Sequence, residues 1–118
     1  MTKVVFLKQK GVFYGFEEHG HTGFADAGND ILCAALSAMT MLIINAVEVT
    51  YASEVDYTID DDTTDIKVIC RGALEKYEKD AKKRYAVSGL IAAYYYQLTD
   101  MTEDYYDFLS VEEEERGI

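Results

Sequence analysis

Proline is absent from this 118-residue sequence, and cysteine occurs only twice. Without proline, the ends of helices and strands must be set by glycine, asparagine, aspartate, serine and threonine. The two cysteines, Cys33 and Cys70, are too few for a scaffold built on disulfides. A chain of this length can bury a core without such bridges, so we expect a single domain over residues 1–118.

Basic residues are also scarce, because 11 Lys and Arg stand against 22 Asp and Glu and give a net charge of −11. A protein that grips RNA or DNA displaces counterions from phosphates with Lys and Arg, and this chain repels phosphates instead. We therefore expect no direct nucleic-acid partner. The same charge attracts a basic protein or peptide, although solubility is the commoner reason for such a composition.

The sequence lacks a clear targeting or membrane-spanning segment. Residues 1–8 are too short and too interrupted by lysine for a signal peptide. The stretch from Ile31 to Val47 is uncharged, but it is at the lower limit of length for a membrane span and is flanked by Asp30 and Glu48 instead of Lys or Arg. We interpret it as a buried helix of a cytoplasmic protein with no membrane partner.

Alternating apolar residues and turn residues predict the order strand-strand-helix-strand-strand-helix. This order is typical of a two-layer α+β domain, in which helices cover one face of an antiparallel sheet of about four strands. The expected strands are residues 4–7, 12–16, 55–59 and 66–70, and the expected long helices run from Asn29 or Asp30 to about Val47 and from about Ala73 to Leu98.

Two further features concern the first long helix and the C-terminal residues. The helix is apolar on every side, so it must be covered both by its own sheet and by another helix or subunit. We expect a homodimer as the economical way to cover it. Near the C-terminus, Asp100 and Thr102 favour a short last helix over residues 105–109. The acidic tail, Glu112 to Glu115, is interpreted as a solvated end.

Cys33 is placed by this reading in the first turn of the first helix. Unpaired N–H groups and the positive end of the helix dipole favour an anion there, which favours a reactive thiolate. A lone cysteine in an apolar helix is more commonly an inert core residue. Cys33 alone therefore leaves both interpretations open.

His21 lies twelve residues before Cys33 on a glycine-rich loop that contains Gly20, Gly23 and Gly28. Such a loop can fold back so that the imidazole meets the thiol and forms a Cys–His pair, with glycines as hinges because only glycine visits positive φ freely. A histidine is suited to this task because it titrates near neutral pH. The competing interpretation is an ordinary turn histidine on a rigid loop.

The combination of these residues resembles the ribosomal-processing cysteine proteases (Prp) of certain bacteria. The matching residues are Gly20-His21, Gly28 and the run Asp30-Ile31-Leu32-Cys33-Ala34-Ala35-Leu36-Ser37, with the same spacing between histidine and cysteine. Thr22 departs mildly from the small residue, commonly alanine, that follows the histidine in this family.

The resemblance implies a cysteine endopeptidase that removes a short N-terminal extension from a large-subunit ribosomal protein, cutting after a small residue preceded by aromatic ones. It implies a cytoplasmic dimer whose glycine-rich loop moves to admit the peptide, with Cys33 as nucleophile and His21 as general base. Because ribosomal proteins are basic, an acidic enzyme suits such a substrate. The alternative is a non-catalytic acidic adaptor that binds a basic ribosomal or assembly protein.

Two neighbouring residues have supporting roles to consider. Asp30 either orients His21 or caps the helix, and Ser37, one turn beyond Cys33, is either a pocket hydroxyl or a small packing residue. Backbone N–H groups near the helix start, including that of Cys33, are candidate donors to an oxyanion. A zinc site from His19, His21 and Cys33 lacks a fourth ligand, so we expect no metal and no other cofactor.

Overall fold

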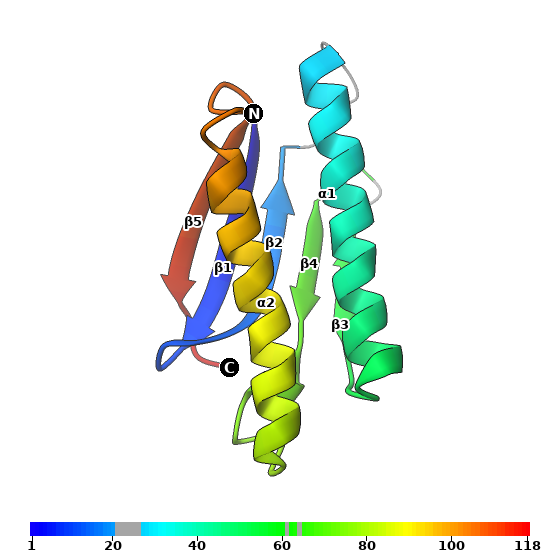
Figure 1. The fold of residues 1–118 in the computed structure, drawn as a ribbon, viewed down its shortest axis with the longest axis vertical. Coiled ribbons are helices and arrows are strands. Elements are labelled where there is room, and N and C mark those ends of the chain that lie inside the picture. Colours follow the sequence, from blue (N-terminus) through cyan, green and yellow to red (C-terminus); the bar gives the residue numbers. More distant parts are fainter. Residues whose placement is uncertain (21–26, 61, 64) are drawn as a thin grey trace.

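The structure is a computed structural model that describes residues 1–20, 27–60, 62–63 and 65–118, with residues 27–30 described by their backbone alone. The described residues form a sheet and two long helices (Figure 1). In chain order the elements are β1 (Thr2–Gln9), β2 (Val12–His19), α1 (Ala27–Asn45), the π-helical segment η1 (Ala46–Thr50), β3 (Asp56–Ile59), β4 (Ile66–Ile69), the 3₁₀ turn η2 (Arg71–Ala73), α2 (Ala81–Met101) and β5 (Leu109–Glu115).

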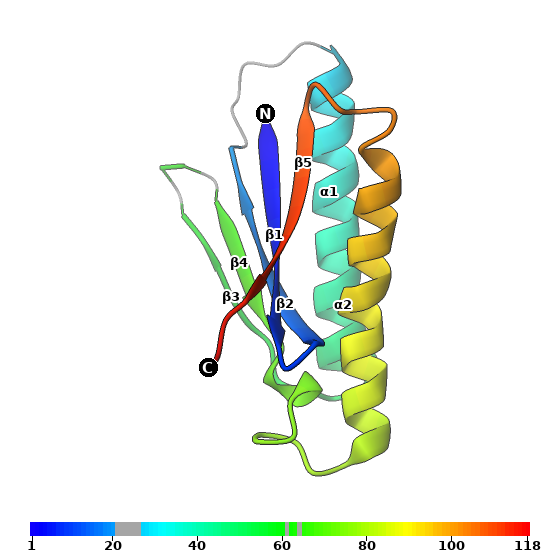
Figure 2. The same cartoon turned by 90° about the vertical axis from the view of Figure 1, so that its left-hand side faces the viewer.

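The sheet has five strands in the described part of the chain, in the order β3-β4-β2-β1-β5. Neighbouring strands are antiparallel except β5, which runs parallel to β1. Both helices cover the same face of the sheet (Figure 2). The predicted α+β class with helices on one face is therefore confirmed, whereas the expectation of about four antiparallel strands is wrong.

The fifth strand is made largely of the acidic tail that we expected to be a solvated end. Leu109 is buried and anchors the start of β5 beside Thr2 of β1. Farther along, Lys3 and Lys8 of β1 each form an ion pair of 3.3 Å, with Glu112 and Glu113 respectively. A run of glutamates can serve as a strand here because β5 lies at the edge of the sheet, where charged side chains reach water.

The second long helix begins later than expected. It starts at Ala81, where the side chain of Asp80 caps it by accepting a 2.9 Å hydrogen bond from the N–H of Lys82. The preceding residues, which have a helix-like composition, form η2 and turns instead. After Met101 the backbone forms turns and then β5, so the predicted short last helix is also wrong.

The first long helix is buried along one side only. Its inward stripe contributes Leu32, Leu36, Ile43 and Ile44 to the core, and Val47 of η1 continues that stripe. Its outward stripe, by contrast, leaves large apolar side chains at 60% to 74% exposure, namely Ile31 and Leu42 together with Val49 of η1. The segment Ile31–Thr50 is long and apolar enough by composition to cross a membrane, and a third of it is buried in this fold. Within one domain, only the inward side of this helix is covered, and the outward side that we expected a second helix or subunit to cover is left exposed.

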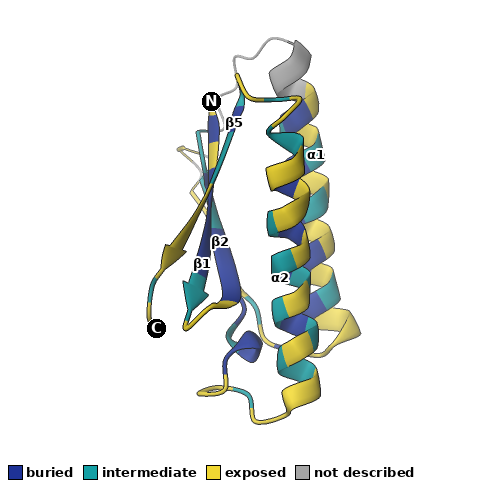
Figure 3. Ribbon diagram, turned by 60° about the vertical axis from the view of Figure 1, so that its left-hand side comes forward, coloured by how far each residue is buried: buried dark blue, intermediate teal, exposed yellow. Residues whose placement is uncertain are grey.

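An aromatic cluster joins α2 to the first two strands. Phe6 of β1 lies at its centre, with ring centroids 5.2 to 6.2 Å from those of Phe13, Phe16, Tyr94 and Tyr95. Most of these contacts are edge-on, an arrangement that aromatic rings favour. In Figure 3 the buried residues line the interior between the sheet and the helices. The aromatic cluster therefore packs α2 against β1 and β2.

Candidate active site around Cys33 and the end of β2

Cys33 is the seventh residue of α1 and is half-buried. The helix begins at Ala27, two residues before the earlier of the two expected caps, so Cys33 lies in the second turn and the prediction of the first turn is wrong. Only the first four N–H groups of a helix lack an intrahelical partner, and the dipole effect falls off within that turn. The anion-favouring groups at the start of α1 are therefore the N–H groups of residues 27–30, one turn before Cys33.

The two cysteines differ sharply in their surroundings. Cys70 follows β4, is fully buried, and its burial raises the pKa of its thiol to about 12. A thiol held in that state is a poor nucleophile, because the thiolate is the reactive form. Cys33, in contrast, is partly open to solvent on α1. Of the two thiols, the one with access to a ligand is Cys33.

The other predicted catalytic residue, His21, lies outside the described residues, and so do Thr22 and Gly23. The described chain fixes both ends of the segment that carries it, because β2 ends at His19 and α1 begins at Ala27. Gly28 belongs to the first turn of α1 instead of the loop, and the side chain of Asp30 is not described. The pairing of His21 with Cys33 thus stays a prediction.

Gly20, immediately before His21, adopts a backbone conformation that favours glycine. Its φ is +85°, in the left-handed region that favours glycine. A Cβ atom at this position would lie 2.3 Å from the carbonyl oxygen of Met1. Glycine is therefore required here both for its backbone conformation and for the close approach of the Met1 carbonyl, while its role as a hinge of the loop stays a prediction.

Asp65 holds the same end of β2, and sequence reasoning missed it. One of its oxygens lies 3.1 Å from Nδ1 of His19, and the other accepts a 3.4 Å hydrogen bond from the N–H of Gly20. The hydrogen bond from His19 is the chief reason that the pKa of Asp65 is lowered. Asp65 thus anchors the two residues that precede His21 to the start of β4.

A buried carboxylate, Glu18, lies on the helix-facing side of β2 and was also missed. Its side chain is fully buried, and Oε1 accepts hydrogen bonds from the hydroxyls of Thr40 on α1 at 2.8 Å and Tyr94 on α2 at 2.7 Å. Burial, together with the charge of Glu18, raises the pKa of Tyr94 above its ordinary value. The network ties the strand that leads to His21 to the helix that carries Cys33.

The remaining predicted residues have simple positions. Ser37 is exposed one helical turn after Cys33, so its hydroxyl lies on the same side of α1. His19 is partly exposed and paired with Asp65. Within the described ranges, no group of three or more His, Cys, Asp or Glu side chains is arranged to hold a metal ion.

Comparisons with known proteins show which family this chain is similar to. The model of a family described as "Cysteine protease Prp" matches residues 1–110. No curated protein matches the chain by sequence. The match to the family spans α1 with Cys33, the loop with His21 and nearly the whole sheet.

Three solved structures share the fold over almost the entire chain. The crystal structure of SMU.848 from Streptococcus mutans is 26% identical, with a TM-score of 0.79 over 98% of this chain and 99% of that one. An essential ribosomal processing protease Prp from S. aureus, in complex with a substrate peptide, is 16% identical with a TM-score of 0.72 over 97% and 100% of the two chains. The same protease with a covalently linked product peptide is 17% identical with a TM-score of 0.70 over 97% and 100%.

Proposed function

This chain belongs to the cysteine protease Prp family, and from that premise we propose that it is a cysteine endopeptidase that removes a short N-terminal extension from a large-subunit ribosomal protein. The observation that carries the proposal is the family match over residues 1–110. The difference between the two thiols adds to it, because Cys33 is accessible at the family's motif whereas Cys70 is sealed in the core.

The proposed reaction is acyl transfer to sulfur followed by hydrolysis. The thiolate of Cys33 attacks the scissile carbonyl carbon, and protonated His21 gives its proton to the leaving amine as the C–N bond breaks. Neutral His21 then takes a proton from water, whose oxygen attacks the thioester carbonyl, and the C–S bond breaks to release the acid and the Cys33 thiolate. This step restores the pair of thiolate and protonated His21 with which the cycle began. The N–H groups of residues 27–30, at the start of α1, are the nearest helix-end donors for the oxyanion.

The proposed substrate is a basic polypeptide. The S. aureus relative is described in complex with a substrate peptide, and the net charge of −11 on this chain favours encounter with a basic partner. The same charge argues against direct binding to nucleic acid. The enzyme would encounter such a substrate during ribosome assembly. We therefore propose that it acts in the cytoplasm.

A second copy of the chain is proposed to cover the outward stripe of α1. Ile31, Leu42 and Val49 give this stripe a large exposed apolar area for a soluble domain. Beside it, an apolar groove of about 330 Å³ opens between α1 and α2, with Leu42 in one wall and Leu90 in the other. Continuous apolar surface of this kind is typical of homodimer interfaces, so we propose that the protease is a homodimer.

The test is a cleavage assay with N-terminal peptides of the large-subunit ribosomal proteins of the source organism, followed by mass spectrometry. We expect the wild type to cut one peptide once, and Cys33→Ala and His21→Ala to leave it whole. Cys70→Ala is the matched control, because it removes the other thiol and should retain cutting. Binding of a peptide without cutting by the wild type would instead identify an adaptor, and cutting by Cys33→Ala would remove Cys33 from the mechanism.

A further inference from the structure

A second candidate binding site lies at the end of the molecule opposite to Cys33. Cys33 is near the start of α1, whereas this pocket lies between the β1–β2 turn and the start of α2, which are at the other end of the long axis in Figures 1 and 2. Its volume is about 450 Å³, within the range of pockets that hold small molecules, roughly 300–1,000 Å³. Four cationic side chains line it: Lys10, Lys76, Lys79 and Arg84.

These cations stand out because the protein as a whole is strongly acidic. Only 11 residues of the chain are Lys or Arg, and four of them line this one pocket, together with a single carboxylate, Glu75. Most of the other cations are paired with carboxylates, namely Lys3, Lys8, Lys67, Arg71, Lys83 and Arg116. Within the described part of the chain, none of the four pocket cations forms such an ion pair.

Hydrogen bonds to main-chain oxygens hold Lys79 and Arg84 in place without neutralising their charges. Lys79 Nζ donates to the main-chain oxygen of Glu75 at 2.8 Å, and Arg84 Nη1 donates to that of Glu78 at 2.7 Å. A peptide carbonyl oxygen carries no net charge, so the positive charges of Lys79 and Arg84 persist. Lys76 Nζ donates at 3.2 Å to the main-chain oxygen of Ile118, the last residue of the sequence, so the retained charge is attributed to Lys79 and Arg84 only. Positive charge gathered in a concave site attracts an anion.

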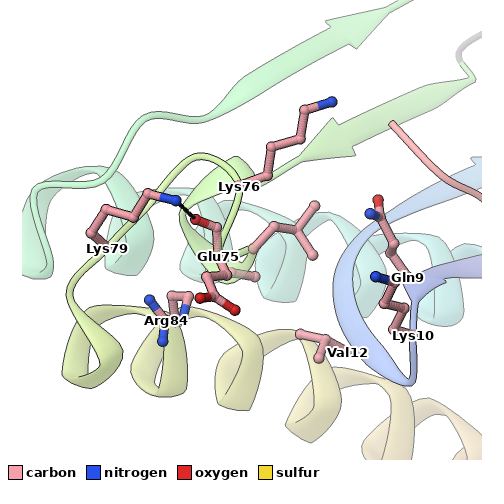
Figure 4. A pocket seen from close by; sticks show the side chains of 9 residues that line it. Gln9, Lys10, Val12, Glu75, Lys76, Lys79 and Arg84 are labelled. Carbon is pink, nitrogen blue, oxygen red and sulfur yellow. Dashed lines mark hydrogen bonds between the residues drawn. The ribbon is translucent and has the colours of Figure 1, made fainter.

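The pocket residues come from two separated segments that the fold brings together. Figure 4 shows Lys79 and Arg84 on one side of the pocket and Lys10 with Gln9 on the other. The turn that carries Lys10 is fixed, because the N–H groups of Lys10 and Gly11 donate to the carboxylate of Glu115 at 3.1 and 3.0 Å. The cations are therefore presented by backbone that is already in place before a ligand arrives.

Apolar residues complete the lining. Ala73 and Leu74 are both buried, and Val12 adds an apolar side chain from the start of β2. A ligand that fits has one strongly anionic part and one apolar or flat part. A long polyanion such as RNA is disfavoured by the charge of the whole chain, whereas a small ligand meets only the local field.

We propose that this pocket binds a small phosphorylated ligand. A phosphate group carries a charge of about −1.5 to −2 and three acceptor oxygens, which suits several cations better than a single carboxylate does. The planar guanidinium of Arg84 can donate two parallel hydrogen bonds to phosphate oxygens, and the flexible lysine side chains add positive charge near them. Arginine and lysine commonly act in these ways at phosphate sites. This site does not depend on the peptidase activity proposed above.

The experiment is isothermal titration of the full chain with pyrophosphate, adenosine diphosphate and citrate at constant ionic strength. We expect saturable binding of one molecule of either phosphate compound, with citrate at least about tenfold weaker. Tighter binding of adenosine diphosphate than of pyrophosphate would show that the pocket recognises an organic phosphate whose apolar part contacts the apolar wall. Equal binding of the two would show that the phosphate groups alone determine the affinity. Absence of saturable binding of both phosphates, or equal binding of citrate, would overturn the proposal.

Two substitutions locate the site. Lys79→Gln and Arg84→Gln should each weaken pyrophosphate binding by about tenfold, the loss expected for one charge-assisted contact. Lys82→Gln is the matched control, because Lys82 forms no ion pair among the described residues and does not line the pocket, yet it carries the same charge on the same helix as Arg84 and three residues after Lys79. Equal weakening by Lys82→Gln would show a general charge effect and contradict the assignment. Because Arg84 also braces the turn before α2, Lys10→Gln provides a third pocket variant on another element.

Discussion

The hydroxyl of Tyr94 on α2 donates a 2.7 Å hydrogen bond to the carboxylate of Glu18, which is fully buried on β2. Thr40 on α1 donates to the same oxygen at 2.8 Å. A buried carboxylate is tolerated only where donors replace the water that it has lost. This one carboxylate therefore links three elements, namely β2 before His21, the helix α1 that carries Cys33, and the helix α2 beside it on the same face of the sheet.

Removing one donor from this network should lower the free energy of unfolding. We expect Tyr94→Phe and Thr40→Val each to cost about 1–3 kcal/mol, because Glu18 then stays buried with one donor fewer. Urea unfolding followed by circular dichroism measures the loss. Tyr96→Phe is the matched control, since Tyr96 is mostly exposed on the same helix and should change stability by less than about 0.5 kcal/mol. Equal effects of Tyr94→Phe and Tyr96→Phe would show that the hydroxyl of Tyr94 contributes nothing.

The accessibility of the two thiols should differ in the native protein. We expect iodoacetamide to add once to the folded chain, at Cys33, and twice after unfolding in urea, because Cys70 is fully buried and its pKa is raised to about 12. Intact-mass spectrometry counts the additions. The Cys33→Ala variant should take up no label while folded. Labelling of Cys70 in the folded protein would contradict the assignment of Cys33 as the accessible thiol.

Gly20 should not tolerate a side chain. Gly20→Ala combines an unfavourable backbone conformation with a clash against Met1, so it should destabilise the protein by more than 1 kcal/mol, a rough lower bound. Gly11→Ala separates the two effects, because Gly11 also has a positive φ, +78°, but a Cβ there meets nothing within 4 Å. Thermal unfolding should therefore rank wild type, Gly11→Ala and Gly20→Ala in decreasing stability. If Gly11→Ala were less stable than Gly20→Ala, the predicted clash between a side chain at position 20 and Met1 would be contradicted.

The clamp formed by Asp65 should weaken in acid. Its pKa lies below the ordinary 3.8, chiefly through the hydrogen bond from His19, so its stabilising effect is present above the unfolded-state value and is lost as pH falls through the lower folded-state value. Because the pair is partly exposed, Asp65→Asn should cost less than about 1 kcal/mol at neutral pH. The stability difference between the variant and the wild type should shrink steadily below pH ~4.

A suitable control for this clamp is Asp62→Asn, which removes the same charge from the same β3–β4 turn. Asp62 uses its N–H, not its carboxylate, in the hydrogen bond to Asp60. Urea unfolding at several pH values compares the two variants. A stability difference for Asp65→Asn that does not change between neutral and acid pH would contradict the role assigned to its carboxylate.

How far the sequence could predict this fold depends on how local the determining contacts are. The alternation around Phe16 and the turn at Gly11 are local, so the β1–β2 hairpin was predictable. The role of the acidic tail was not, because β5 pairs with β1 across the whole length of the chain. Residues 73–80 have helical composition, but the cap at Asp80 and the packing of Leu74 set a later start for α2.

The candidate site was predictable to a similar extent. Cys33 and His21 carry a spacing that can be read from the sequence, and the structure describes the first of them. Glu18 follows Phe16 at a period of two, so its inward direction was available from the strand pattern. Its donors were not, because Thr40 and Tyr94 are 22 and 76 positions away in sequence. A buried polar network is specified by tertiary packing, which no local pattern contains.

The exposed stripe of α1 should determine the oligomeric state. If a second copy covers it, Leu42→Lys places a charge in an apolar interface and should convert a dimer into a monomer, as measured by size-exclusion chromatography with light scattering. Tyr106→Lys is the control, because Tyr106 is similarly exposed but lies between α2 and β5, outside the helix that carries the stripe. A wild-type protein that stays monomeric at high concentration would contradict the dimer. Sedimentation of the protein only in the presence of lipid vesicles would also contradict the dimer. The apolar segment Ile31–Thr50 would then be covered by a membrane instead of by a second protomer.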